Sequence, residues 1–429
     1  MTRFDPSLCR LVLVSAVTMA VGWGLRGFIG GGSLGAMIPG ALIALVIGHG
    51  LGLPDATCAR LAAFGAVGIG FGGQETYGQT VRFVTNYGDE FFRGLAGLTV
   101  KGAVWGFVGG AVLGVALIAR RVRHRDLALA LVALIAGTWL GWRFIDEPKL
   151  LYFSNLHDKP RPEVWAGLFT GGLGFLGVLV WRLRAAARVP WVLALAGLVG
   201  GGIGFGAGGA SYAAGMGLGF DARWYPGWKQ MEFTFGLCLG AALGFAAYRL
   251  RDAIRESSAA AEANTALDRH AWWSLASAGL AGALLGASGR LPLRFDYTVA
   301  GAALLVLAWW SRRAAWQIAL TITVAAFALD VGEFYTANHL PDHPRPAAAV
   351  ALLGAFAVAV VVAVRERQGR EMTRWALLLL LGTAVGAACV RAALHQKITP
   401  ALMITTAAFV VGGATVAVLL RVPKPSFPP

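Results

Sequence analysis

The chain has 429 residues, of which 57% are hydrophobic and only 14% are charged. A soluble protein of this length would be about one quarter charged, so this composition, with a mean hydropathy of +0.64, excludes an ordinary soluble enzyme. The formal charge of +15 suggests nucleic acid as a partner, but the basic residues lie in short segments between apolar runs, which argues against it. The sequence predicts an all-α integral membrane protein.

Apolar runs recur along the whole chain. A run of about 18 or more apolar residues is long enough to cross roughly 30 Å of hydrocarbon as a helix. No run is typical of a cleaved signal peptide, because the first is long enough to span and lacks a small-residue cleavage motif. We predict about fourteen transmembrane helices, over residues 11–28, 34–53, 60–76, 95–118, 127–145, 164–181, 190–213, 231–248, 272–289, 297–311, 316–334, 347–364, 375–391 and 399–420.

The connections between these helices differ in charge on the two sides of the membrane. The side that holds both termini carries 22 Lys and Arg against 9 Asp and Glu, and the other side carries 15 against 13. Basic residues in short loops mark the cytoplasmic side. We therefore expect a multi-pass protein of a bacterial-type inner (cytoplasmic) membrane, with cytoplasmic N- and C-termini.

Glycine motifs indicate an internal repeat. Gly22-Trp23 recurs as Gly141-Trp142, and the glycine run that begins at Gly68 recurs from Gly202. Repeated helix units are common in transporters, and regularly spaced glycines let helices pack closely. We interpret the chain as two four-helix membrane repeats, a cytoplasmic linker and a six-helix region that holds a diverged third copy, over residues 1–126, 127–250, 251–271 and 272–429 respectively.

One highly charged connection, residues 143–165, has a counterpart near the other end of the chain. Asp146 precedes the segment Asp158-Lys159-Pro160-Arg161-Pro162 at the same spacing at which Asp330 precedes Asp342-His343-Pro344-Arg345-Pro346. The prolines fix φ and hold the arginine in an extended turn. We expect the first copy to bind ligand and the second, with Asp330, Asp342 and Arg345, to be a structural loop.

Charged residues within or beside membrane spans are costly and indicate function by default. The predicted topology places those of this chain toward the extracytoplasmic side. Arginine binds phosphate or carboxylate, carboxylates bind hydroxyls, and aromatic rings cover apolar sugar faces. An aromatic belt with interfacial ion pairs explains the same pattern structurally. The candidate substrate-binding residues are Arg26, Glu75, Arg82, Lys101, Arg143, Asp146, Glu147, His157, Asp158, Arg161 and Glu232.

The leading functional interpretation is a transporter of a polar, anionic or hydroxylated solute, with its site at the extracytoplasmic side. One alternative is a membrane-embedded transferase for a lipid-linked or periplasmic glycan or phosphate substrate, with Asp146 or Glu147 as general base. Another is a structural subunit of a membrane complex. No metal-ligand set is complete, and no particular cofactor is indicated. The expected partners are the lipid bilayer and the solute or lipid-linked substrate, without nucleic acid; homo-oligomerisation is left open.

Overall fold

The computed structural model describes residues 5–421 apart from 30, 87, 259–269, 271, 289–292, 340–344 and 396. These described residues form helices and no strand, which confirms the all-α prediction. The α-helices are α1 (Pro6–Arg26), α2 (Gly32–Gly50), α3 (Asp55–Gly72), α4 (Gly78–Thr85), α5 (Phe91–Leu117), α6 (His124–Gly141), α7 (Trp165–Leu183), α8 (Arg188–Gly217), α9 (Gly227–Arg249), α10 (Arg251–Ser258), α11 (Trp272–Ala287), α12 (Asp296–Trp310), α13 (Arg312–His339), α14 (Arg345–Arg367), α15 (Thr373–Leu394) and α16 (Pro400–Leu419).

Three short helical turns complete the architecture. The 3-10 turn η1 (Ala119–Arg121) follows α5, the π-helical turn η2 (Trp142–Asp146) continues α6, and the 3-10 turn η3 (Arg184–Ala187) joins α7 to α8. Within the described residues, ten helical segments are long and apolar enough to cross a membrane. One of them, the 53-residue segment Trp165–Gly217, contains both α7 and α8. These helices support a multi-pass membrane protein, while the number fourteen remains a prediction.

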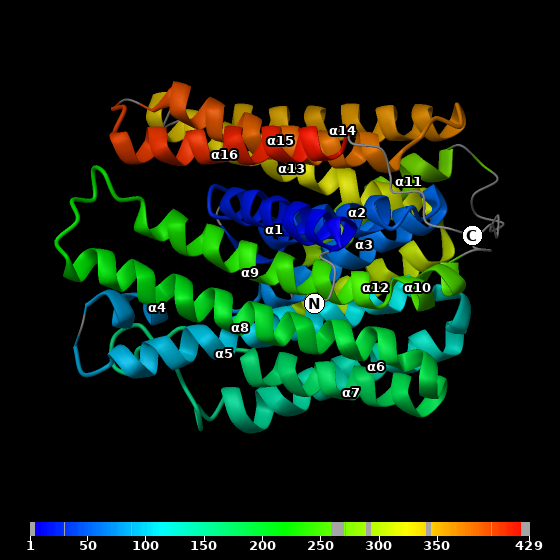
Figure 1. Cartoon of the computed structure of the whole chain (residues 1–429), viewed down its shortest axis with the longest axis horizontal. Coiled ribbons are helices and arrows are strands. Elements are labelled where there is room, and N and C mark those ends of the chain that lie inside the picture. The colour runs from blue at the N-terminus through cyan, green and yellow to red at the C-terminus, as the bar shows by residue number, and fades with distance from the viewer. Residues whose placement is uncertain are drawn as a thin grey trace.

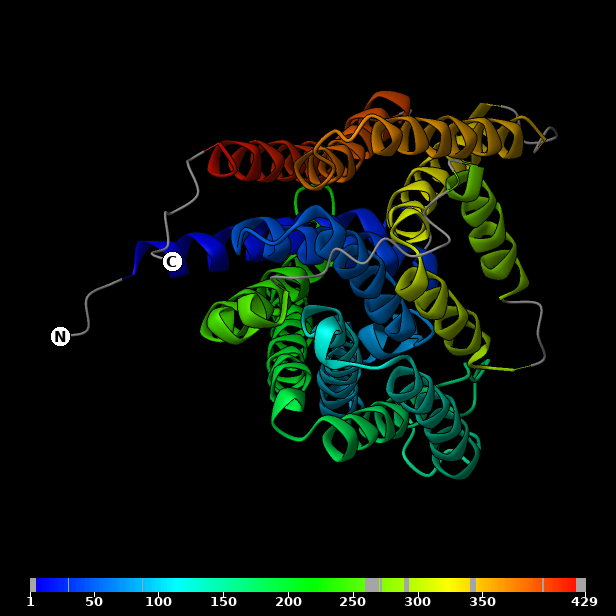
Figure 2. The same ribbon diagram turned by 90° about the vertical axis from the view of Figure 1, so that its right-hand side faces the viewer.

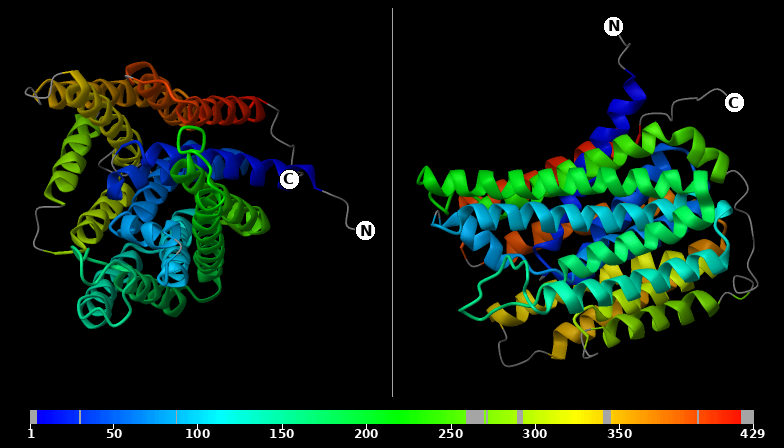
Figure 3. Two further views of the ribbon diagram at one scale, coloured as in Figure 1. Left: turned by 90° about the vertical axis from the view of Figure 1, so that its left-hand side faces the viewer. Right: turned by 90° about the horizontal axis from the view of Figure 1, so that it is seen from below.

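Most of the long helices are roughly parallel to the horizontal direction of Figure 1, so the bundle has two ends. The end that carries α4 is called the α4 end, and the opposite one, which carries α10, is called the α10 end. Seen end-on, α1 to α3 lie in the middle, between a layer of α13 to α16 and the helices α5 to α9 (Figure 2). The view from below shows α5, α8 and α9 side by side, with the loops near α4 at one end (Figure 3).

Glycine faces bring several helices into backbone contact. A Cβ atom added at Gly106 on α5 would collide with the carbonyl oxygen of Gly197 on α8, and the converse holds for Gly197. Gly110 meets the backbone of α8 in the same way, and Gly240 on α9 meets the backbone of α1 at Ser15. The regularly spaced glycines of α5, α8 and α9 thus lie in helix interfaces, where the lack of a side chain permits close approach.

Large aromatic side chains fill the centre of the bundle. The ring centroids of Trp23 and Trp105 are 5.0 Å apart, and those of Trp23 and Phe235 are 4.4 Å apart, both in edge-to-face geometry. All three side chains are almost fully buried. Edge-to-face aromatic pairs add to the stabilisation that burial alone gives. This cluster joins α1, α5 and α9, and its rings Trp23 and Trp105 contact the guanidinium of Arg26.

Candidate functional site

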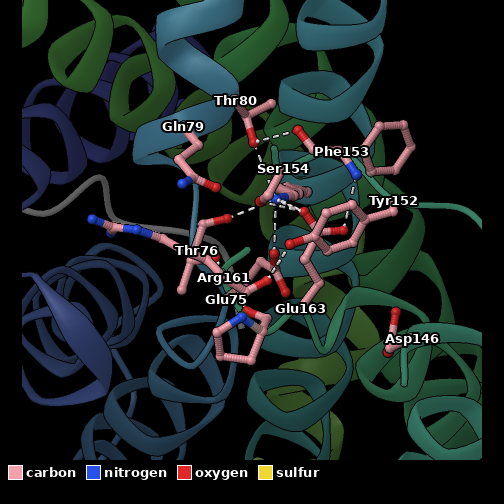
Figure 4. Close-up of polar contacts among 12 residues, drawn as sticks. Glu75, Thr76, Gln79, Thr80, Asp146, Tyr152, Phe153, Ser154, Arg161 and Glu163 are labelled. Atoms are coloured by element: carbon pink, nitrogen blue, oxygen red, sulfur yellow. Dashed lines mark hydrogen bonds and ion pairs between the residues drawn. The ribbon is translucent and has the colours of Figure 1, made fainter. Parts of the chain in front are cut away.

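Lys101 on α5 is the centre of a buried polar cluster at the α4 end. Figure 4 shows its partners Glu75, Glu163 and Thr80. Its Nζ atom lies 2.9 Å from Glu75 Oε1 and 2.7 Å from Glu163 Oε1. It also donates hydrogen bonds to the Thr76 carbonyl at 2.6 Å and the Thr80 hydroxyl at 3.1 Å. The lysine side chain is inaccessible to solvent, and a buried ammonium requires such partners to offset its loss of hydration.

The two carboxylates of this cluster also hold backbone groups. Glu163 accepts hydrogen bonds from the Phe153 backbone N–H at 3.1 Å and from the Ser154 hydroxyl at 2.7 Å. Glu75 accepts one from the Val164 N–H at 2.8 Å. Glu75 and Glu163 both contact the Lys101 ammonium, so the two carboxylates lie close together. Two carboxylates that share one cation favour retention of a proton by one of them.

Polar side chains of α4 and α5 fasten the 147–164 loop over this cluster. Gln79 donates to the carbonyl of Lys159 at 3.0 Å and accepts from the Asn155 N–H at 3.1 Å. Arg93 donates to the carbonyls of Tyr152 and Ser154, at 3.0 Å and 2.9 Å. These contacts satisfy loop carbonyls and amides that would otherwise be costly to bury. The contacts of Lys101, Glu75 and Glu163 therefore favour loop anchoring as their role.

Asp146 binds backbone groups at the start of α7. Its carboxylate accepts hydrogen bonds from the backbone N–H groups of Ala166 at 3.2 Å and Gly167 at 2.8 Å. These groups belong to the first turn of α7, whose N–H groups lack partners within the helix. The side chain of Arg161 is exposed, and Figure 4 shows it on the opposite side of the cluster from Asp146. Asp146 thus caps a helix.

The remaining candidates of these loops lie on the surface. Arg82 projects from α4 into solvent, and His157, Asp158 and Arg161 are exposed in the loop. Arg143 and Glu147 form an exposed ion pair one helical turn apart. Exposed pairs of this kind contribute little to stability. These side chains form the outer rim of the α4 end and are accessible to a solute.

Arg26, at the last residue of α1, is buried among aromatic rings. Its guanidinium carbon lies 4.7 Å from the ring centroid of Trp105, 5.0 Å from that of Tyr77 and 5.6 Å from that of Trp23. It donates a hydrogen bond to the Tyr77 hydroxyl at 2.5 Å. The residue is 2% exposed, and its Nε–H has no hydrogen-bond partner among the described residues. A buried hydrogen-bond donor without a partner destabilises the folded state, and in native proteins such a group commonly has a functional explanation.

Helix α9 brings the carboxylate of Glu232 and the ammonium of Lys229 close to Arg26. The Glu232 carboxylate lies 2.7 Å from Lys229 Nζ and accepts a hydrogen bond from the Trp228 indole at 3.0 Å. The Trp228 ring stacks on Tyr77, with centroids 5.8 Å apart. Gly27 follows Arg26 directly, and a Cβ atom there would collide with Glu232 and Lys229. We call Arg26, Tyr77, Trp228, Lys229 and Glu232 the central cluster.

The C-terminal region supplies a further ion pair beside the central cluster. Arg391 on α15 lies 3.3 Å from Asp330 on α13 and donates to the Phe28 carbonyl at 2.9 Å. Lys229 and Arg391 both lie over the Phe28 ring, with their charged groups 4.1 Å and 5.0 Å from its centroid. Asp330 is therefore in an ion pair between helices. Asp342 and the side chain of Arg345 lie outside the described residues.

A cavity of about 360 Å³ opens at the α4 end next to the central cluster. Its wall includes the polar side chains of Ser33, Gln74 and Arg294, and the glycines Gly31 and Gly32. A Cβ atom at Gly31 would lie 3.4 Å from Arg26 Nη2, so this glycine borders both the cavity and the guanidinium. The structure thus places a small polar cavity beside a buried arginine.

Several residues of these clusters were not among the predicted site residues. Trp228 and Lys229 precede Glu232 by four and three positions, which puts them on one helix face, so their spacing could have identified them. No comparable signal connects Glu163 to Lys101, because their contact joins the interior of α5 to the loop before α7, far apart in the chain. Tyr77 lies in a connection with no periodic pattern, and only its aromatic character marks it.

The described residues contain no group of three or more His, Cys, Asp and Glu side chains that could hold a metal ion. The clusters instead combine guanidinium, ammonium, carboxylate and aromatic groups, which suit a polar organic or phosphate-bearing solute. The helices and these clusters together define the class, a multi-pass helical membrane protein with two clusters of buried charged residues at the α4 end. No protein-family model, curated protein or solved structure matches the chain.

Proposed function

We propose that the protein is an inner-membrane transporter of an anionic, polar solute, and that the solute binds at the central cluster. The observation that carries this proposal is the burial of Arg26 with an Nε–H that has no partner, beside a polar cavity at the α4 end. A guanidinium forms charge-assisted hydrogen bonds with carboxylate or phosphate. Buried charge in a membrane protein indicates a solute pathway by default.

The proposed topology has fourteen spans. In it the segment Trp165–Gly217 crosses the membrane twice, and α3, α11 and α12 cross in addition to the other long apolar helices. The packing of α3 against α2 and α5, and of α12 against α3 and α13, supports this proposal. The charge difference between the two ends favours a cytoplasmic α10 end. The two four-helix repeats remain part of the same proposal.

In the proposed mechanism, Arg26 binds the anionic group of the solute, and Tyr77 and Trp228 contact its less polar face. Glu232 neutralises Lys229 while the site is empty. An entering anion competes with Glu232 for Lys229, so that occupancy changes the contact between α9 and the end of α1. Movement of helix units around a site near the membrane mouth then gives access to the other side.

Thermal melting of the purified protein tests the site directly. Inorganic phosphate, glycerol 3-phosphate and succinate serve as anionic probes, and glucose serves as a neutral one. At about one hundred times its dissociation constant, a ligand stabilises the folded state by about 2.7 kcal/mol. We expect at least one anionic probe to raise the melting temperature of the wild-type protein, and Arg26→Gln to abolish that rise.

Two variants control this measurement. Arg26→Lys keeps the charge and should retain part of the shift, while Arg223→Gln removes an arginine whose side chain is 80% exposed and should retain all of it. Equal shifts in wild type and Arg26→Gln would contradict the proposed site. Uptake of the stabilising probe into proteoliposomes then separates transport from catalysis, because an enzyme would alter the probe without accumulating it.

The orientation is tested by cysteine labelling in a variant that lacks the four native cysteines. Single cysteines at Arg123, Arg184 and Arg367 should be protected from a membrane-impermeant thiol reagent in intact cells, because basic loops stay on the cytoplasmic side. Cysteines at Asn86 and His157, both exposed at the α4 end, should react. Permeabilised cells provide the control, since all five positions should then be labelled. The reverse pattern in intact cells would invert the proposed topology.

A further inference from the structure

A second cavity, of about 500 Å³, lies at the α10 end, where α6 begins and α7 ends. Its lining includes five arginines and one carboxylate, namely Arg121, Arg123, Arg125, Asp126, Arg182 and Arg184. Like charges gathered in one place repel one another unless counter-charges offset them. This arginine pocket is far from the central cluster, at the other end of the bundle, and plays no part in the proposed transport site.

The carboxylates nearby are already engaged. Asp126 pairs with Arg182 at 2.8 Å, and Glu256 on α10 pairs with Arg121 at 2.6 Å. Arg123 and Arg184 are exposed and form no ion pair with a carboxylate among the described residues. The pocket therefore keeps an excess of positive charge, and its guanidinium groups suit a phosphate.

The backbone at Arg184 supports a binding role for this residue. Its φ is 49° and its ψ is −115°. Residues other than glycine rarely adopt this backbone conformation. Such a conformation costs free energy and is commonly found at functional sites. A glycine would occupy this turn without strain, yet the chain carries an arginine there. Its side chain contributes to the wall of the pocket.

The pocket opens beside an exposed apolar surface of α7. On α7, Val180 and Trp181 are 48% and 68% exposed, and the guanidinium of Arg182 lies 5.1 Å from the Trp181 ring centroid. Helices α6 and α7 lie at the periphery of the bundle (Figure 2). Tryptophan is typical of the membrane–water interface. Basic pockets between membrane spans on the cytoplasmic side bind anionic headgroups.

We propose that the arginine pocket binds the phosphate of an anionic phospholipid, whose acyl chains lie along the exposed faces of α6 and α7. Free phosphate offers the same chemistry to the guanidinium groups. The lipid is favoured because the pocket adjoins an apolar surface that can receive acyl chains. This inference goes beyond the proposed transport function and does not depend on the identity of the transported solute.

The test is thermal melting of the purified full-length protein in detergent with added phosphatidylglycerol, phosphatidylcholine, inorganic phosphate or glycerol 3-phosphate. Phosphatidylglycerol should raise the melting temperature more than phosphatidylcholine does. In Arg123→Gln/Arg184→Gln, the phosphatidylglycerol concentration for a half-maximal shift should rise at least about tenfold. The matched control is Arg367→Gln/Arg370→Gln, which removes the same charge from exposed positions at the same end and should respond as wild type does.

A second variant separates binding from folding. Arg184→Gly relieves the backbone at this position, so its melting temperature in phosphatidylcholine should equal or exceed that of wild type, while its response to phosphatidylglycerol should weaken. An unchanged response in both pocket variants would overturn the proposal. A shift by inorganic phosphate or glycerol 3-phosphate as large as that by phosphatidylglycerol, lost in the pocket variants, would identify a soluble phosphate as the ligand and overturn the lipid assignment.

Discussion

Replacement of Lys101 by methionine is expected to destabilise the protein by about 3–5 kcal/mol, the usual cost of removing one partner from a buried ion pair. The change leaves Glu75 and Glu163 buried and close together without their shared cation. It also removes a hydrogen bond from each of the Thr76 carbonyl and the Thr80 hydroxyl. Thermal melting and the protease sensitivity of the 147–164 loop measure the effect.

The two carboxylates should respond differently to neutral replacement. Glu75→Gln should cost less than Glu163→Gln, because Glu75 accepts a single backbone hydrogen bond, from Val164, besides its contact with Lys101. Glu163, in contrast, accepts hydrogen bonds from Lys101, Phe153 and Ser154. Combined with Lys101→Met, Glu75→Gln should restore part of the lost stability, which a double-mutant cycle detects as coupling.

The control for this series is Arg82→Met, which removes an exposed cation from neighbouring α4 and should change the melting temperature little. If Lys101→Met melted as wild type does and lost only the response to an anionic probe, Lys101 would bind ligand, and the loop-anchoring role would be wrong. That outcome would agree with the expectation from the sequence, which placed Lys101 and Glu75 among the substrate-binding residues.

The second large effect is expected at the interface of α5 and α8. Gly106→Leu should prevent the two helices from approaching, because even a Cβ atom at this position collides with the Gly197 backbone. Overpacking a core usually costs about 1–3 kcal/mol. A larger loss is expected here, since the obstructing atoms belong to a helix backbone and not to a mobile side chain. Expression level and thermal melting of the purified protein measure it.

Gly177 on α7 provides the matched control for this substitution. It is an exposed glycine within an apolar helix, and a Cβ atom there meets nothing within 4 Å. Gly177→Leu should therefore fold and melt as wild type does. Normal melting of Gly106→Leu would show that α5 and α8 do not pack through this face.

The sequence alone predicts the helices well, because an apolar run in a lipid environment has few alternatives to a helix. The glycine spacing also predicts which faces pack closely, as Gly110 and Gly240 show. The partners of the charged residues are harder to predict. Arg26, Glu232 and Arg391 meet at one end of the bundle although they lie far apart in the chain. Such contacts depend on how the helices are arranged, which local patterns do not encode.

The repeated motif illustrates the same limit. The two copies keep the same spacing between their first Asp and the Arg of Pro-Arg-Pro. In the first copy, however, Asp146 caps α7 and Arg161 projects outward. A conserved distance along the chain can result from a shared turn geometry, without any contact between the two charged ends. The exposed prolines of the loop impose that geometry independently of any contact between the charged side chains.

The Lys101 cluster has a consequence for the order in which the protein is made. Ribosomal synthesis delivers Glu75 first, then Lys101, and Glu163 only after α6 has been completed. Lys101 is therefore made when only one of its two carboxylate partners is present. The pair of one ammonium and one carboxylate carries no net charge, which reduces the cost of insertion. Glu163 joins this pair only when the polypeptide has returned to the α4 end. We therefore expect the 147–164 loop to close late in biogenesis, after α5 and α6 have been synthesised.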